Sequence, residues 1–161
     1  MQGHWCCCRV LALQHAGVDV VDRVVELIDG PSQDRVLVAV DGPDAAGKTT
    51  FADRLAEAMR APTGRVSVDS FLRPRHLRYQ RGELFSLGYY LDSFEHGALL
   101  EGCLRPFRAG GRQITVSAAA QQDDDASCGP PVLVPGRAVL VVDGCSCCVR
   151  GFASSGPWRA T

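Results

Sequence analysis

The sequence contains a single lysine, Lys48, whereas its other sixteen cationic side chains are arginines. Lys48 lies in residues 42–49 (GPDAAGKT), which fit the pattern G-x-x-x-x-G-K-[ST] of a phosphate-binding loop. Such a loop needs a slim, flexible ammonium that reaches the β- and γ-phosphates, and a planar guanidinium does this less well. The retention of lysine at this one position therefore predicts a chain that binds a nucleoside triphosphate.

Long apolar runs and an excess of charge of one sign are also missing. No apolar stretch approaches the roughly 20 residues that a membrane-spanning helix needs, so we expect no membrane partner. The net charge of −1 gives no electrostatic reason to expect nucleic acid. The apolar run near the N-terminus is short and is broken by Arg9, which does not fit a secretory signal and favours a cytoplasmic protein.

The eight cysteines lack the spacing of a metal site or of a disulfide framework. Three are contiguous at residues 6–8, three lie at residues 145–148, and Cys103 and Cys128 lie between. No C-x₂-C pair is followed by a spaced partner pair, as zinc modules require. We expect reduced thiols. A zinc site built from His4, Cys6, Cys8 and the C-terminal cysteines is the alternative.

The residues around Lys48 predict the strand, loop and helix of a phosphate-binding unit. Residues 35–41 (RVLVAVD) form a short apolar, β-branched run typical of a buried parallel strand. Residues 49–60 predict a helix, which Pro62 and Gly64 should end. Its apolar positions at helical spacing are Phe51, Leu55, Ala58 and Met59.

Other segments predict an α/β protein of the P-loop NTPase or kinase type, with a doubly wound parallel sheet. Residues 18–28 predict an amphipathic helix with Val18, Val21, Val25 and Ile28 on one face. Residues 65–69 and 138–143 predict strands, and residues 92–104 predict a helix limited by Pro106. Residues 109–136 predict loop around a weak strand at 113–116. We expect one domain over residues 1–161, in which residues 1–17 have no assigned role.

The loop predicts the binding of ATP together with Mg²⁺. Gly42 and Gly47 permit backbone angles and close approaches that a Cβ would hinder. Backbone N–H groups of the loop and of the first helical turn should point at the phosphates. Lys48 should neutralise the β- and γ-phosphates, and the Thr49 hydroxyl should bind Mg²⁺. The predicted nucleotide-binding residues are Gly42, Asp44, Ala45, Ala46, Gly47, Lys48, Thr49 and Thr50.

Two acidic residues lie at the carboxyl ends of predicted strands. Because ligands of doubly wound sheets bind beyond the carboxyl ends of the strands, Asp69 and Asp143 are candidates for the site. Asp143 ends an apolar run and predicts a metal-supporting acid, whereas Asp69 is the candidate general base. A helix cap or a solvated turn is the alternative for each.

Four blocks of the chain resemble the uridine kinase family of P-loop nucleoside kinases, especially its bacterial uridine kinase-like branch. The blocks are residues 38–50 (VAVDGPDAAGKTT), 66–75 (VSVDSFLRPR), 79–94 (YQRGELFSLGYYLDSF) and 138–144 (AVLVVDG). They cover the recognisable kinase core, residues 35–144. The resemblance implies that Asp69 activates the acceptor hydroxyl.

The resemblance also implies that the segment from Phe71 to Tyr90 helps to form the nucleoside site, with Phe71, Arg73, Tyr79 and Tyr90 as candidate substrate contacts. A solvated surface segment is the alternative for the basic part of this segment. Pro43, Asp44 and Ala45 depart from the Ser- and Gly-rich loop of the family, and the Asp-Gly-Pro opening also looks like that of cytidylate kinases.

The resemblance breaks after Gly144. The family continues with an arginine-bearing lid and two further strands, in sheet order 2-3-1-4-5, whereas residues 145–161 fit no such element. We therefore expect a fold that is incomplete at the C-terminus, with an aberrant tail explained by a frameshift in a GC-rich gene. A genuine short C-terminus is the alternative. In the truncated fold, the strand at 35–41 would lie at a sheet edge, and activity would suffer from the missing lid arginines.

The leading hypothesis is an ATP-dependent phosphotransferase that acts on a hydroxyl of a nucleoside or a similar small acceptor. The alternatives are a non-catalytic ATP-binding remnant, a nucleoside monophosphate kinase and a P-loop hydrolase or switch. The sequence gives no prediction of the acceptor's identity or of the oligomeric state.

Overall fold

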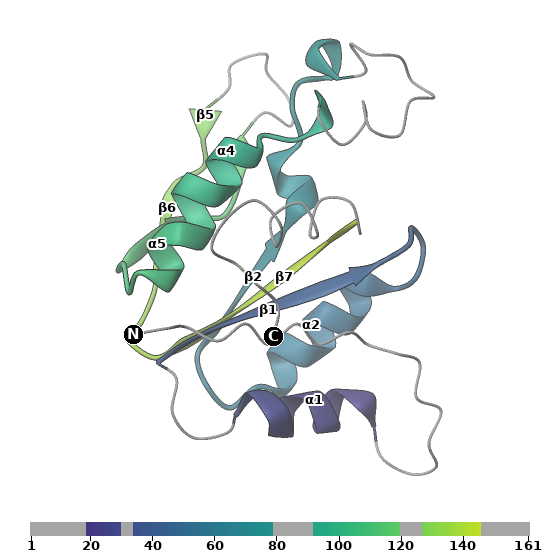
Figure 1. The fold of residues 1–161 in the computed structure, drawn as a ribbon, viewed down its shortest axis with the longest axis vertical. Coiled ribbons are helices and arrows are strands. Elements are labelled where there is room, and N and C mark those ends of the chain that lie inside the picture. Colours follow the sequence, from purple (N-terminus) through teal and green to yellow (C-terminus); the bar gives the residue numbers. More distant parts are fainter. Residues whose placement is uncertain (1–18, 30–33, 79–91, 120–126, 146–161) are drawn as a thin grey trace. The chain divides into compact units, whose positions relative to one another are not determined.

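A computed structural model of the chain describes residues 19–29, 34–78, 92–119 and 127–145. The chain divides into two compact units (Figure 1). We call Met1–Val66 with Pro135–Thr161 the sheet unit and Ser67–Val134 the inserted unit. The single domain over residues 1–161 stays a prediction, and the expected tail lies, apart from Cys145, outside the described residues.

The three-stranded sheet has the order β1-β7-β2, formed by β1 (Arg35–Gly42), β7 (Ala138–Cys145) and β2 (Thr63–Ser67). β1 and β7 are parallel and remain in register from Arg35 opposite Ala138 to Gly42 opposite Cys145. The predicted parallel α/β architecture is therefore confirmed. In the described part of the chain, the strand that precedes the loop lies at an edge of the sheet, as expected.

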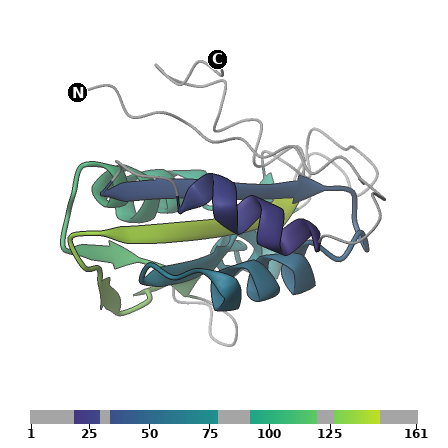
Figure 2. The same ribbon diagram turned by 90° about the horizontal axis from the view of Figure 1, so that it is seen from below.

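Two helices, α1 (Val20–Ile28) and α2 (Lys48–Ala58), cover one face of this sheet (Figures 1 and 2). Period-2 alternation in the strands points every second side chain at the helices, and burial of these apolar side chains stabilises the layer. The shared core consists of Val21, Val24, Ile28, Val38, Val40, Ala52, Leu55, Met59, Val139 and Val141.

Helix α1 begins at a side-chain cap. The Asp19 carboxylate accepts a hydrogen bond from the Val21 N–H at 3.0 Å, and this bond is the largest cause of the lowered pKa of Asp19. The predicted amphipathic helix is confirmed, but its buried stripe runs through Val24, whereas Val25 is half-buried. Val18 lies outside the described residues.

Helix α2 confirms the helix predicted over residues 49–60, with a shift at both ends. Leu55 and Ala52 are fully buried, and Met59, just past the helix, is also buried. Ala58, predicted as an apolar contact, is exposed. The predicted buried face of α2 was wrong at Ala58 and did not include Ala52. Helix α2 packs on both α1 and the sheet, and this second contact buries Ala52.

The inserted unit begins with two 3-10 turns, η1 (Val68–Phe71) and η2 (Arg75–Leu77). It continues with a helical segment made of α4 (His96–Leu99), the π-helical η3 (Leu100–Leu104) and α5 (Arg105–Arg108). Two small antiparallel sheets follow. They pair β3 (Gln113–Thr115) with β6 (Pro131–Leu133), and β4 (Ala118–Ala119) with β5 (Ser127–Cys128).

Two expectations for the inserted unit were wrong in part. The strand at 113–116 is confirmed, but the region expected as loop contains three further short strands. Pro106 was expected to limit the helix, yet the helical segment runs on to Arg108. A proline clashes with the carbonyl four residues earlier in an α-helix. Here the turn before Pro106 is π-helical, because the Arg105 N–H donates to the carbonyl oxygen of Leu100. The proline ring therefore follows a turn that is wider than that of an α-helix.

The largest fully buried side chains of the inserted unit are apolar. Phe71, Leu99, Cys103 and Phe107 are each 1 % exposed or less. Burial raises the pKa of the Cys103 thiol to about 12, so this cysteine stays a neutral thiol and packs as a small apolar residue.

Among the helices of the described residues, none has the length and apolar character needed to cross a membrane.

Candidate functional site

The loop between β1 and α2 is held by backbone conformations that favour small residues. Gly47, the N-cap of α2, has φ +76°, and a Cβ built there would meet no heavy atom within 4 Å. The backbone angle, not crowding, therefore explains this glycine. Ala45 also has a positive φ, +60°. Gly42 needs no such angle, and its Cβ would make only ordinary contacts with Ala46 and Lys48.

The Lys48 side chain folds back over this loop. Its Nζ donates to the carbonyl oxygen of Pro43 at 2.8 Å and lies 3.9 Å from the Asp44 carboxylate. The Lys48 side chain is 13 % exposed, whereas that of Asp44 is 97 % exposed. The ammonium is therefore positioned above the loop by the Pro43 carbonyl, with the solvated Asp44 carboxylate adding little.

The sheet brings Thr49 and Asp143, the two residues predicted to hold the metal, within hydrogen-bonding distance. Asp143 follows Val139 and Val141 on the helix-facing side of β7, where its side chain is 3 % exposed. The Thr49 Oγ1 hydroxyl, in the first turn of α2, donates to Asp143 Oδ2 at 2.8 Å. Because a hydroxyl has one hydrogen, this bond directs the lone pairs of Oγ1 away from Asp143.

Arg65 of β2 completes this cluster and was missed by the sequence analysis. Its Nη1 donates to Asp143 Oδ1 at 2.9 Å, and its Nε donates to Asp53 Oδ1 of α2, also at 2.9 Å. Both oxygens of the Asp143 carboxylate therefore have partners. The only sequence signal was a cation in the middle of a short strand, which becomes informative once β2 is known to lie beside β7.

Asp69, the predicted base, lies in the inserted unit and not at the end of a strand. β2 ends at Ser67, and Asp69 is exposed in the 3-10 turn η1. The turn is capped by Ser67, whose Oγ accepts the Asp69 N–H at 3.3 Å, while the Leu72 N–H donates to Asp69 O. The serine cap ends the strand two residues earlier than expected.

No family model matches the chain, and no curated protein matches it. The structure of this chain is similar to the solved structure of a possible uridine kinase from Bacillus stearothermophilus, with a TM-score of 0.67. The identity is 22 %, over 86 % of this chain and 73 % of that chain. The chain has a P-loop kinase fold.

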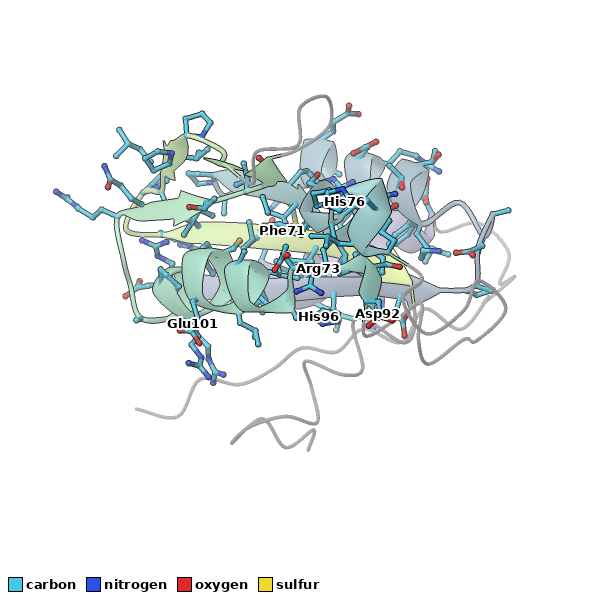
Figure 3. All side chains as sticks on the ribbon, turned by 90° about the horizontal axis from the view of Figure 1, so that it is seen from above. Phe71, Arg73, His76, Asp92, His96 and Glu101 are labelled. Carbon is cyan, nitrogen blue, oxygen red and sulfur yellow. The ribbon has the colours of Figure 1, made fainter. Side chains whose placement is uncertain are left out.

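Of the four predicted substrate contacts, the structure describes Phe71 and Arg73, which Figure 3 labels. Phe71 is fully buried, and the Arg73 Nε donates to Glu95 Oε1 at 2.7 Å. Tyr79 and Tyr90 lie outside the described residues.

His96, in the same unit, has a lowered pKa. Burial is the largest cause and the Arg73 charge is the second, whereas the Glu95 charge opposes them. The lowered pKa favours a neutral imidazole.

The donor atoms at Thr49 and Asp143 fit a hard divalent cation such as Mg²⁺, because a hydroxyl and a carboxylate both offer oxygen. They cannot form a complete metal cage. Among the described residues, no group of three or more His, Cys, Asp or Glu side chains could hold a metal ion.

Proposed function

We propose that this protein is an ATP-dependent phosphotransferase that moves the γ-phosphate of ATP to a hydroxyl of a small acceptor. The observation that carries the proposal is the hydrogen bond of 2.8 Å between Thr49 and Asp143. It joins the first turn after the glycine loop to a carboxylate on the adjacent strand, which is the pairing that a nucleotide-bound Mg²⁺ needs.

Each residue of the loop then has a defined role. Lys48 would exchange the Pro43 carbonyl for β- and γ-phosphate oxygens, and its charge would stabilise the transferred group. The N–H groups at the start of α2 would add hydrogen bonds and the favourable end of the helix dipole. Bound Mg²⁺, held by Thr49 and supported by Asp143, would withdraw charge from the phosphates.

Asp69 is the residue that we propose as general base. A carboxylate can accept the proton of the acceptor hydroxyl while the hydroxyl oxygen bonds to the γ-phosphorus and ADP leaves. Its exposure in η1 supports this role, because a base must be accessible to the acceptor. The name of the structural neighbour makes uridine the first acceptor to assay, and the resemblance of the sequence to the uridine kinase family makes cytidine the second.

Lys48→Ala tests nucleotide binding. We expect loss of ATP binding by at least about tenfold, because the loop loses its only cationic side chain. The matched control is Arg60→Ala, which removes one positive charge from an exposed position beyond α2 and should leave ATP affinity unchanged. Isothermal titration calorimetry measures both. Equal ATP affinity in wild type and Lys48→Ala would falsify the loop assignment.

Asp69→Asn tests the transfer step. We expect ATP binding to be retained and phosphoryl transfer to uridine or cytidine to fall by about 10²–10⁴-fold, the usual loss for a general base. The assay follows ADP formation with and without acceptor. ADP formed equally without acceptor would indicate a hydrolase, and ATP binding without turnover of any acceptor by the wild type would indicate the non-catalytic alternative. Either result contradicts the proposal.

A further inference from the structure

Arg65 forms an ionic bridge beside the candidate metal ligands Thr49 and Asp143. Its guanidinium joins three elements, because it extends from β2, donates to Asp143 on β7 and donates to Asp53 on α2. Nη1 also lies 3.5 Å from the carbonyl oxygen of Val141. The Arg65 side chain is 23 % exposed, so solvent screens this bridge less than it would a surface pair.

The bridge neutralises a buried charge. Because the Asp143 side chain is 3 % exposed, its carboxylate would be costly without a counterion or a full set of hydrogen bonds. Thr49 supplies one hydrogen bond but no charge. Arg65 supplies both a hydrogen bond and the compensating positive charge. Asp53, on the exposed side of α2, binds the Nε and fixes the guanidinium in this position.

The same bridge lowers the attraction of the site for a free cation. The Arg65 charge offsets that of Asp143, whereas the charge of Asp53, whose side chain is 56 % exposed, is screened by solvent. Asp143 Oδ1, which could otherwise bind a cation, already accepts from Arg65. A divalent ion at Thr49 and Asp143 would gain two protein oxygens and meet a like charge beyond the carboxylate. Because Mg²⁺ gives up its hydration waters reluctantly, these two oxygens hold a free ion only weakly once Arg65 offsets the carboxylate charge.

We propose that Arg65 is a resident counterion of Asp143 that prevents the Thr49–Asp143 pair from binding a divalent cation alone, so that the cation enters only with nucleotide phosphates. The part of this inference that concerns phosphates rests on the proposed function. The part that concerns the free cation depends only on the ion pair. Arg65 is a positioning and charge-compensating residue in this account, with no contact to the transferred group.

The test compares Arg65→Met with Arg65→Lys in the full chain without nucleotide. Methionine keeps an unbranched chain and removes the charge, whereas lysine keeps the charge. Mn²⁺ binding is measured by the loss of the free-ion electron paramagnetic resonance signal. We expect Arg65→Met to bind Mn²⁺ at least about tenfold more tightly than the wild type, because removing a neighbouring like charge commonly shifts ionic equilibria by one or more decades. Arg65→Lys should bind Mn²⁺ as weakly as the wild type.

Two results would overturn the proposal. The first is that Arg65→Met binds Mn²⁺ with an affinity within about twofold of that of the wild type. Such a change would be smaller than the effect expected from the removal of a nearby charge. The other is an equal gain in Arg65→Lys, which would assign the effect to packing. The double variant Arg65→Met with Asp143→Asn is the control and should lose the gain, because it removes the carboxylate that the cation would meet.

Loss of Arg65 leaves the buried Asp143 charge without its counterion, so Arg65→Met could be unfolded without added ions. In that case circular dichroism during a Mn²⁺ titration replaces the binding measurement. Recovery of the folded signal in millimolar Mn²⁺ is then the expected result, and an absence of recovery contradicts the proposal. Because nucleotide is absent throughout, a failure of ATP binding in the Lys48 experiment and a failure of this inference are distinguishable.

Discussion

Ala45 adopts a left-handed backbone conformation that is unfavourable for a residue with a Cβ. Its φ of +60° lies within the glycine loop, between Asp44 and Ala46. An alanine in this conformation costs roughly 1–2 kcal/mol relative to ordinary backbone angles. The loop therefore contains local strain at one of the positions that sequence analysis assigned to nucleotide binding, and glycine there would relieve it.

We expect Ala45→Gly to leave the protein equally stable or to stabilise it by up to about 1 kcal/mol, since relief of the positive φ outweighs the added entropy of the unfolded chain. The matched control is Ala46→Gly, because Ala46 has no positive φ. That variant should destabilise by about 0.5–1 kcal/mol. Urea unfolding followed by circular dichroism measures both. Equal destabilisation by the two glycines would contradict the strain at Ala45.

Single residues also show where sequence reasoning reached its limit. Thr49 and Asp143 could each be named in advance as candidates for the metal, because one follows a recognisable loop and the other ends an apolar strand. Their hydrogen bond was not predicted. Arg65 could not be assigned, because its partners depend on β2 lying beside β7, and strand neighbours are set by the whole fold. Asp69 was misplaced by one local effect, the serine cap at Ser67.

Helix α2 links the loop to the core, so its packing determines how firmly the loop is held. Its first turn carries Lys48 and Thr49, and its middle carries Leu55, which is fully buried against α1 and the sheet. Most of the stability of such a short helix comes from burial of its apolar face. A cavity beneath α2 should therefore weaken the sheet unit.

We expect Leu55→Ala to destabilise the protein by about 2–5 kcal/mol, the usual cost of a buried leucine truncated to alanine. Leu27→Ala is the matched control, since Leu27 is also helical but is 59 % exposed. Its effect should remain within about 0.5 kcal/mol. Both variants replace a helical leucine with alanine, so the difference between their free energies of unfolding, measured by chemical denaturation, reports the effect of burial. Similar losses in the two variants would show that α2 does not pack as described.

The elements that were predictable are those whose signal lies in their own residues. β1 and β7 are apolar β-branched runs, and α1 has a helical apolar stripe. The strands β4, β5 and β6 are two or three residues long, and they exist only through pairing with distant partners. The helix that continues through Pro106 needs a π-helical turn, for which the sequence gives no separate signal.

The chain passes from the sheet unit into the inserted unit with no linker residue between two elements. β2 ends at Ser67 and η1 begins at Val68, so no residue separates them. On the return path, the Val134 N–H donates to Arg112 O at 2.9 Å within the inserted unit. The Arg35 Nε donates to Gly136 O at 2.8 Å within the sheet unit. Independent domains are usually connected by exposed linkers. Residues 135–137 on the return path are exposed, but no linker residue lies between β2 and η1.

We therefore expect the two units to unfold together. Leu55→Ala in the sheet unit and Phe107→Ala in the inserted unit each remove a buried side chain. In a single cooperative domain, both should lower the Tm of the same calorimetric transition, by roughly 10 °C for a loss of about 3 kcal/mol. Differential scanning calorimetry of the wild type and both variants measures this. The contrary result is two transitions, of which Leu55→Ala lowers only one and Phe107→Ala lowers only the other. The chain would then contain two domains, because unfolding of one unit would leave the other unit's core intact.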